Sequence, residues 1–83
     1  MKKEIAIEKF GKDVFYKLVN PNNNVIIAVS NNKSYIESEK SYFDKALKGV
    51  YEKQTIIEKI DFDTAYNLVS DNPLIIRRFY ENN

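Results

Sequence analysis

The chain has 83 residues, enough for one domain with a single core, and we expect one compact domain over residues 1–83. It contains no cysteine and no histidine, which excludes disulfides, zinc fingers, cysteine- or histidine-dependent hydrolases and the usual haem ligands. Its 13 basic and 12 acidic side chains give a net charge of +1, a balance typical of neither nucleic-acid-binding proteins nor acidic DNA mimics. The sequence shows no signal-peptide core and no long apolar segment, so we expect a cytoplasmic protein without a membrane partner.

The first third of the chain predicts three strands. Residues 3–9 alternate in polarity, with Ile5 and Ile7 on one face, which is typical of a half-buried strand. Residues 14–19 have the aromatic and β-branched content of a second strand. Residues 25–29 form an apolar run without polar alternation, which predicts a third strand, buried on both faces at the centre of the sheet. Short turn-rich stretches separate the three, so we expect an antiparallel meander.

The middle of the chain predicts the main helix. Residues 35–52 place their apolar side chains within one arc at helical spacing. Two capping boxes, beginning at Ser34 and at Ser41, leave the start of this helix open between the two positions. With the later start, the two residues after Ser34 form a short edge strand. Residues 55–60 are rich in β-branched side chains and predict a fourth strand.

Two short helices are expected at the end of the chain. Asp61 or Asp63 caps the first, which continues to Val69. Asn72 is a good N-cap, followed by a proline that suits the first helical position, so residues 73–81 predict the second. The predicted fold is therefore α+β, in the order β-β-β-α-β-α-α, with a small antiparallel sheet packed by one main helix and two short C-terminal helices.

Residues 63–78 read Asp-Thr-Ala-Tyr-Asn-Leu-Val-Ser-Asp-Asn-Pro-Leu-Ile-Ile-Arg-Arg and resemble the C-terminal helical corner of the arsenate reductase/Spx family. That family carries a helix ending in an acidic-Asn/His-Pro corner, followed by Leu-Leu-Arg-Arg or Leu-Ile-x-Arg. In the reductases the second arginine position helps to hold the oxyanion, and Spx-like regulators bind bacterial RNA polymerase. The family's cysteine, its proline after the arginines and its thioredoxin-like half are absent here, so the resemblance implies partner binding and excludes reductase chemistry. The matching positions are Tyr66, Leu68, Pro73, Arg77 and Arg78.

Paired arginines and tyrosines supply the first candidate contacts. Arg77 and Arg78 have the guanidinium groups that grip a carboxylate or phosphate of a partner. The plainer interpretation, which we favour, makes them helix-end charges that stabilise the macrodipole. Tyr35 and Tyr51 flank the main helix and combine an apolar ring with a polar tip, as interface residues do. The rim of a small core uses the same residue type.

A second candidate surface is Phe15-Tyr16-Lys17, where aromatic rings adjoin a lysine in a strand, as in platforms that stack single-stranded nucleic acid. Because neighbouring strand residues face opposite sides, one of the two rings is expected in the core. The aspartates near residue 61 are better explained as helix caps than as metal ligands, and we expect no metal and no cofactor.

These patterns predict a small, non-enzymatic protein–protein interaction module that regulates or inhibits a larger bacterial protein. Abundant Asn, Lys and Ile suit an AT-rich bacterial or phage genome, so an anti-defence, anti-CRISPR-like or RNA-polymerase-binding role is the expected setting. The alternative is a single-stranded nucleic-acid-binding protein that uses Phe15, Tyr16 and nearby lysines. An enzyme relying on Asp, Glu, Lys, Tyr or Arg alone is the third class, and no paired-carboxylate spacing supports it. The expected partner-binding residues are Tyr51, Tyr35, Arg77, Arg78, Phe15 and Lys17.

Overall fold

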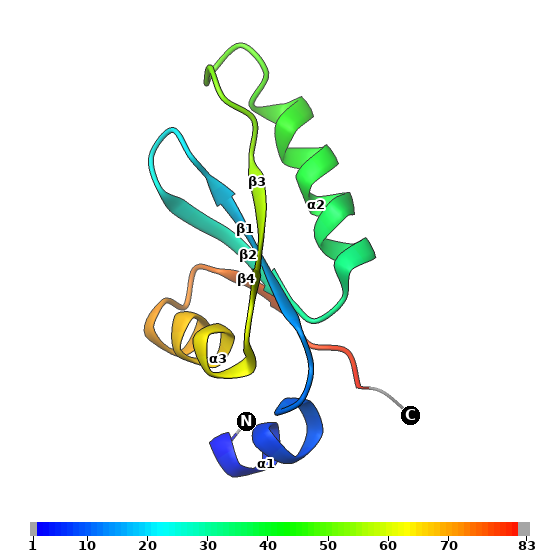
Figure 1. Cartoon of the computed structure of the whole chain (residues 1–83). Helices are drawn as coiled ribbons and strands as arrows, with labels where there is room; N and C mark the ends of the chain where they lie inside the picture. Colours follow the sequence, from blue (N-terminus) through cyan, green and yellow to red (C-terminus); the bar gives the residue numbers. More distant parts are fainter. Residues whose placement is uncertain (1, 82–83) are drawn as a thin grey trace.

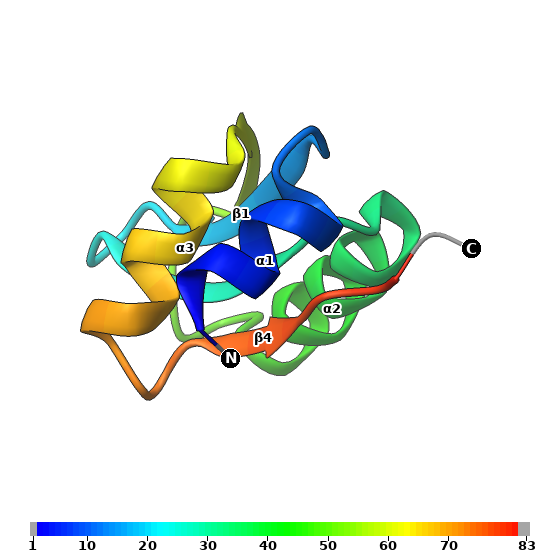
Figure 2. The same ribbon diagram turned by 90° about the horizontal axis from the view of Figure 1, so that it is seen from below.

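The computed structural model describes residues 2–81 and confirms the α+β class, with three helices and four strands in that part of the chain. The strands form one mixed sheet in the order β3-β1-β2-β4, in which β1 pairs antiparallel with β2 and β3 while β4 runs parallel to β2. Helix α2 covers one face, and α1 and α3 lie on the other (Figures 1 and 2). The elements are α1 (Lys3–Phe10), β1 (Phe15–Asn20), β2 (Val25–Ser30), α2 (Lys33–Ala46), β3 (Ile56–Ile60), α3 (Phe62–Asp71) and β4 (Ile76–Arg78).

Strand β2 is an inner strand with side chains packed on both faces, as its apolar run predicts. Val29 lies in the main core, between the sheet and the pair α1 and α3, and Ala28 lies in a smaller cluster beneath α2. The pairing of β1 with β2 shifts between Leu18 and Val19, where a β-bulge leaves Ile27 without a Cα partner. Ile27 and Ala28 therefore both pack toward α2, which explains why the run shows no alternation.

Two clusters hold the layers together. Beneath α2, the buried residues are Leu18, Ala28 and Ile36. On the other face, Phe10, Phe15 and Phe79 meet edge to face, with ring centroids 4.9–6.5 Å apart. The buried residues of this main core are Ala6, Phe10, Phe15, Val29, Phe62, Ala65, Val69 and Ile75.

The predicted first strand is wrong, because residues 3–10 form helix α1. Ala6 and Phe10, one helical turn apart, are the buried pair, whereas Ile5 and Ile7 are 45% and 49% exposed. The helix ends at Gly11, where a Cβ would lie 2.5 Å from the carbonyl oxygen of Ile7. The alternation of the isoleucines was thus misleading, and the surrounding Lys, Glu and Ala were the better guide because they favour helices over strands.

The predicted last helix is also wrong. Asn72 does cap a turn, since its side-chain oxygen accepts a hydrogen bond from the N–H of Leu74 at 3.2 Å, and its carbonyl accepts one from the N–H of Ile75 at 3.3 Å. The turn is not continued, because Ile76 pairs with Ala28 as the start of β4. Pairing with the open edge of β2 therefore replaces the predicted helix, and the predicted antiparallel sheet is a mixed one.

The remaining predicted elements are present with shifted ends. Helix α2 follows the earlier of the two predicted starts, but its N-cap is Asn32, whose side-chain oxygen accepts a hydrogen bond from the N–H of Tyr35 at 2.9 Å. It ends at Ala46, six residues before the predicted 52, and the chain turns through Gly49, which has φ of 84°. Asp61 caps α3 through the N–H of Thr64. No helix within residues 2–81 has the length and apolarity needed to cross a membrane.

Candidate functional site

The turn of Ser30, Asn31 and Asn32 joins β2 to α2 and fixes three segments of the chain at one place. The Ser30 hydroxyl donates to the carbonyl of Arg78 and accepts a hydrogen bond from the N–H of Asn32 at 3.1 Å. The Asn31 side chain donates to the carbonyl of Tyr80 and accepts from its N–H, both at 2.7 Å. Asn32 caps α2 at Tyr35. Three consecutive polar residues thus hold the backbones of Arg78, Tyr80 and Tyr35.

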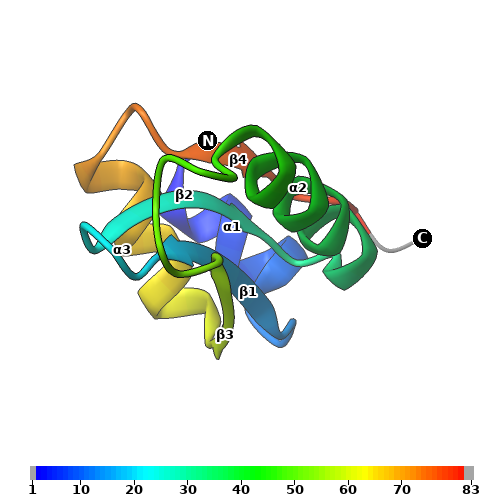
Figure 3. The same cartoon turned by 90° about the horizontal axis from the view of Figure 1, so that it is seen from above.

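The side chains of these three held residues gather on the surface, and we call them the Arg78 cluster: Tyr35, Arg78 and Tyr80. The guanidinium of Arg78 lies 5.1 Å from the ring centroid of Tyr80 and 5.9 Å from that of Tyr35. The two rings are 6.0 Å apart and inclined at 58°. The C-terminal segment runs beside the start of α2, as Figures 2 and 3 show. Both tyrosines are half-buried and Arg78 is exposed, so the cluster faces solvent on a fixed backbone.

The guanidinium of Arg78 contacts two aromatic rings and forms no ion pair with a carboxylate of residues 2–81. Burial raises the pKa of the Tyr35 hydroxyl, and the neighbouring Glu39 carboxylate raises it further, so Tyr35 is neutral at physiological pH. The cluster therefore presents one cation beside two aromatic rings.

The side chains of Arg77 and Arg78 do not converge on one group. In β4 they occupy consecutive positions, Arg77 opposite Val29 and Arg78 opposite Ser30, so their side chains leave opposite faces of the sheet. Arg77 lies on the side of α1 and α3, where it donates to the carbonyl of Asn72 at 3.2 Å. The hypothesis that both arginines grip one group is wrong, and so is their placement at a helix end, because β4 is a strand.

The strand β1 candidates separate in the same way. Phe15 is 0% exposed in the main core, so it cannot contact a partner, and its choice as a binding residue was wrong. Tyr16 is the half-buried ring of the pair and packs under α2. Lys17 is half-buried and lies 3.8 Å from the Glu58 carboxylate of the adjacent strand β3, an ion pair across the sheet. The proposed stacking platform therefore retains a single ring.

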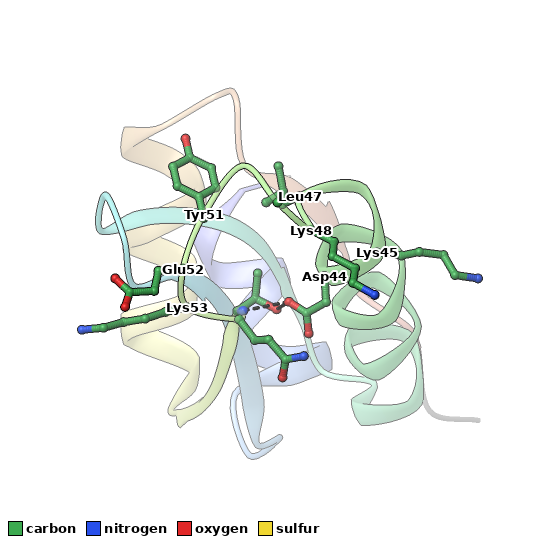
Figure 4. Close-up of a pocket in the computed structure, with 10 residues that line it drawn as sticks. Asp44, Lys45, Leu47, Lys48, Tyr51, Glu52 and Lys53 are labelled. Carbon is green, nitrogen blue, oxygen red and sulfur yellow. Dashed lines mark hydrogen bonds between the residues drawn. The ribbon is translucent and has the colours of Figure 1, made fainter.

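Tyr51 lies in the loop between α2 and β3, at the end of the molecule away from both termini (Figure 1). This loop borders a hollow of about 490 Å³ whose lining includes Lys45, Lys48, Tyr51 and Lys53. Figure 4 shows that Lys45 and Lys53 extend away from the hollow in opposite directions, so their charges do not converge on one point.

Asp44 and Glu52 both line this hollow, and the carboxylate of Asp44 already has hydrogen-bond partners. This carboxylate accepts hydrogen bonds from the N–H and the hydroxyl of Thr55, both at 2.8 Å, and from Lys40 at 2.9 Å (Figure 4 draws dashed lines at Asp44). Burial of Asp44 works to raise its pKa, but the hydrogen bonds from Lys40 and Thr55 outweigh that effect and the pKa is lowered. Asp44 therefore closes the loop onto the helix and is not available for proton transfer.

Among the other acids, Asp61 caps α3, and Glu58 and Glu81 form ion pairs with Lys17 and Lys9. The carboxylate of Asp61 accepts from the N–H of Thr64, which lowers its pKa. Within residues 2–81, no three His, Cys, Asp or Glu side chains are grouped so that they would hold a metal ion.

Comparisons with protein-family models, curated proteins and solved structures find no match. The resemblance of residues 63–78 to the arsenate reductase/Spx family therefore stays a prediction. Of the six predicted contact residues, the structure brings together Tyr35 and Arg78. Sequence reasoning missed Tyr80 and the turn at Ser30, and the available signal was an asparagine pair between a strand and a helix, a place where side chains hydrogen-bond to backbone.

Proposed function

We propose that this protein is a non-enzymatic binding module that regulates or inhibits a larger bacterial protein through the Arg78 cluster. One observation carries the proposal: an exposed arginine without a carboxylate partner in residues 2–81, held against two tyrosine rings. Arginine and tyrosine are among the residue types that dominate the binding energy of protein interfaces. A partner carboxylate placed on the guanidinium would form a charge-assisted hydrogen bond that the protein itself does not supply.

The rigid backbone of the cluster supports the same conclusion. Binding costs less when the contact residues are already ordered, because fewer rotamers are lost on association. The Ser30 hydroxyl and the Asn31 side chain hold the backbone of Arg78 and Tyr80 through three hydrogen bonds. A simpler role, in which Arg78 only covers the rings and protects an edge strand, would make the arginine exchangeable for other polar residues.

The experiment is a pull-down from a low-GC bacterial lysate with the immobilised full chain, its Arg78→Gln variant and a Lys59→Gln control. Lys59 is an exposed cation on the opposite edge strand, with β1 and β2 between it and the cluster, so the control removes the same charge outside the cluster. We expect the wild type and the control to retain a stoichiometric partner. Arg78→Gln should weaken its binding by about thirtyfold, the effect of a hot-spot residue.

Two results would contradict this proposal. If the wild type retained no stoichiometric protein, the proposal of a protein partner would be refuted. If all three chains retained the partner equally, the cluster would not be part of the interface. A single-stranded oligonucleotide retained in place of a protein, with binding that weakens steeply as salt rises, would favour the nucleic-acid alternative.

A further inference from the structure

We propose that the partner supplies an extended acidic segment that adds as a fifth strand to the outer edge of β4, with neighbouring carboxylates on Arg77 and Arg78. The inference rests on the proposed function, and it specifies the chemistry that the same site recognises. The outer edge of β4 pairs with no other strand of residues 2–81. An extended peptide that joins such an edge gains backbone hydrogen bonds along its length and is selected by alternate side chains.

Hydrogen bonds on the inner side of this edge continue beyond the end of β4. Residues 76–78 pair with β2 on their inner side. Beyond the end of β2, the side chain of Asn31 hydrogen-bonds to both the N–H and the carbonyl of Tyr80, so these two backbone groups are satisfied on the inner side. The segment from Ile76 to Tyr80 is therefore ordered before any partner arrives, which lowers the entropy cost of strand addition.

The two charged side chains of β4, Arg77 and Arg78, are both basic and lie on opposite faces of the sheet. Arg78 lies on the α2 side next to its two tyrosine rings, and Arg77 lies on the other side beside a hollow of about 280 Å³ that Ala6 and Tyr66 help to line. Neither guanidinium forms an ion pair with a carboxylate of residues 2–81. Since consecutive residues of an added strand also face opposite sides, two adjacent acidic residues would meet the two arginines.

The other edge of the sheet lacks this selectivity. Strand β3 carries Glu58 and Lys59 at its consecutive exposed positions, one acid and one base, and Glu58 is already near Lys17. An acidic strand would be attracted to one face of β3 and repelled from the other. The sheet therefore has one edge with mixed charge and one edge that favours an acidic strand.

The test uses the full chain and a synthetic six-residue peptide of Thr and Val with a central Asp-Glu pair, titrated to about 1 mM and followed by backbone amide NMR. We expect shifts and slower hydrogen exchange for residues 76–80. Arg77→Gln and Arg78→Gln should each weaken binding by about tenfold, and Lys59→Gln should leave it unchanged. A matched peptide with Asn-Gln in place of Asp-Glu should lose most of the binding.

Backbone methylation of the peptide separates strand addition from simple charge attraction. An added strand directs alternate N–H groups toward the edge, so N-methylation of one alternate set should abolish binding and methylation of the other set should spare it. Equal binding of both methylated peptides, or no binding of the acidic peptide, would overturn strand addition. If the pull-down still yields a partner that depends on Arg78, the proposed function stands without it. Stronger shifts with oligothymidylate than with the acidic peptide at residues 76–80 would also overturn the inference.

Discussion

Two asparagine side chains, one before β2 and one after it, hold a distant backbone residue by the same pair of hydrogen bonds. Asn22 donates to the carbonyl of Lys53 at 2.7 Å and accepts from its N–H at 3.1 Å. Asn31 makes the corresponding bonds to Tyr80, both at 2.7 Å. The first fixes the loop between α2 and β3, and the second fixes the C-terminal segment. Each side chain thus extends backbone pairing beyond the end of a strand.

The surroundings of the two asparagines differ. Asn22 is exposed, and it holds the loop beside the hollow, where Lys45 of α2 and Lys53 of the loop extend in opposite directions (Figure 4). Asn31 is half-buried and also donates to the carboxylate of Asp13 at 3.0 Å, so it joins the segment before β1 to the segment around Tyr80. A hydrogen bond contributes more where water cannot replace the lost partner. The proposed binding surface lies at the Asn31 end, where we expect the backbone to be held more firmly.

The largest expected effect is that of Asn31→Ala. The substitution leaves the N–H and carbonyl of Tyr80 without their side-chain partner in a half-buried place, and we expect it to lower the free energy of unfolding by about 2 kcal/mol. Urea unfolding followed by circular dichroism measures the change. If Asn22→Ala destabilised the protein as much, the difference between the two ends of β2 would be refuted.

Asp44→Asn tests what holds the loop at the Asn22 end. The variant loses the charge that Lys40 pairs with, and we expect a loss of about 1 kcal/mol near neutral pH. The folded protein lowers the pKa of Asp44 below its ordinary value of 3.8. The carboxylate therefore stabilises the fold above that value, and the stabilisation disappears as pH falls through the folded-state pKa.

The measurement for Asp44 is a series of urea unfolding curves from neutral pH into acid. The gap in stability between wild type and Asp44→Asn should narrow as the pH drops below about 4. A gap of constant size across this range would show that the Asp44 charge does not contribute.

Asn22→Ala should have a smaller effect, about 0.5 kcal/mol, because water can replace its exposed hydrogen bonds to Lys53. The more sensitive measurement is amide hydrogen exchange. We expect faster exchange in residues 47–55 and unchanged exchange in β2. Faster exchange across the whole sheet would show that this loop supports the fold as strongly as the C-terminal segment does.

The sequence predicts those elements whose own side chains decide their structure. The apolar run of β2 needs burial on two faces, and Asp61 caps a helix wherever one follows, so both predictions succeed. The two failures depend on a distant partner. Helix α1 buries Phe10 against Phe79, near the other end of the chain, and β4 exists because β2 offers an open edge. Neither contact can be predicted from local periodicity, because the two partners are far apart in the sequence.

The sequence could predict which residue types form the candidate site, but not that they would meet. Tyrosine and arginine are enriched among the residues that dominate binding energy at interfaces, so residue type alone made Tyr35 and Arg78 candidates. Their meeting depends on the parallel pairing that sets Arg78 opposite Ser30, and on the cap that starts α2 at Asn32. The assignment of Phe15 failed because alternation in β1 shows that one of two adjacent rings is buried without showing which one.

Arg78→Gln should change stability least, by no more than about 0.5 kcal/mol, because the side chain is exposed and its contacts with two tyrosine rings are shared with water. The same substitution should abolish most of the partner binding, so stability and binding separate at this residue. Arg78→Lys keeps the charge but not the planar guanidinium, and its binding should be intermediate. Urea unfolding and the pull-down, performed on the same preparations, measure both quantities. If Arg78→Gln lowered stability as much as Asn31→Ala, the Arg78 cluster would be part of the structural support at that end of β2, and its proposed role in binding would lose its basis.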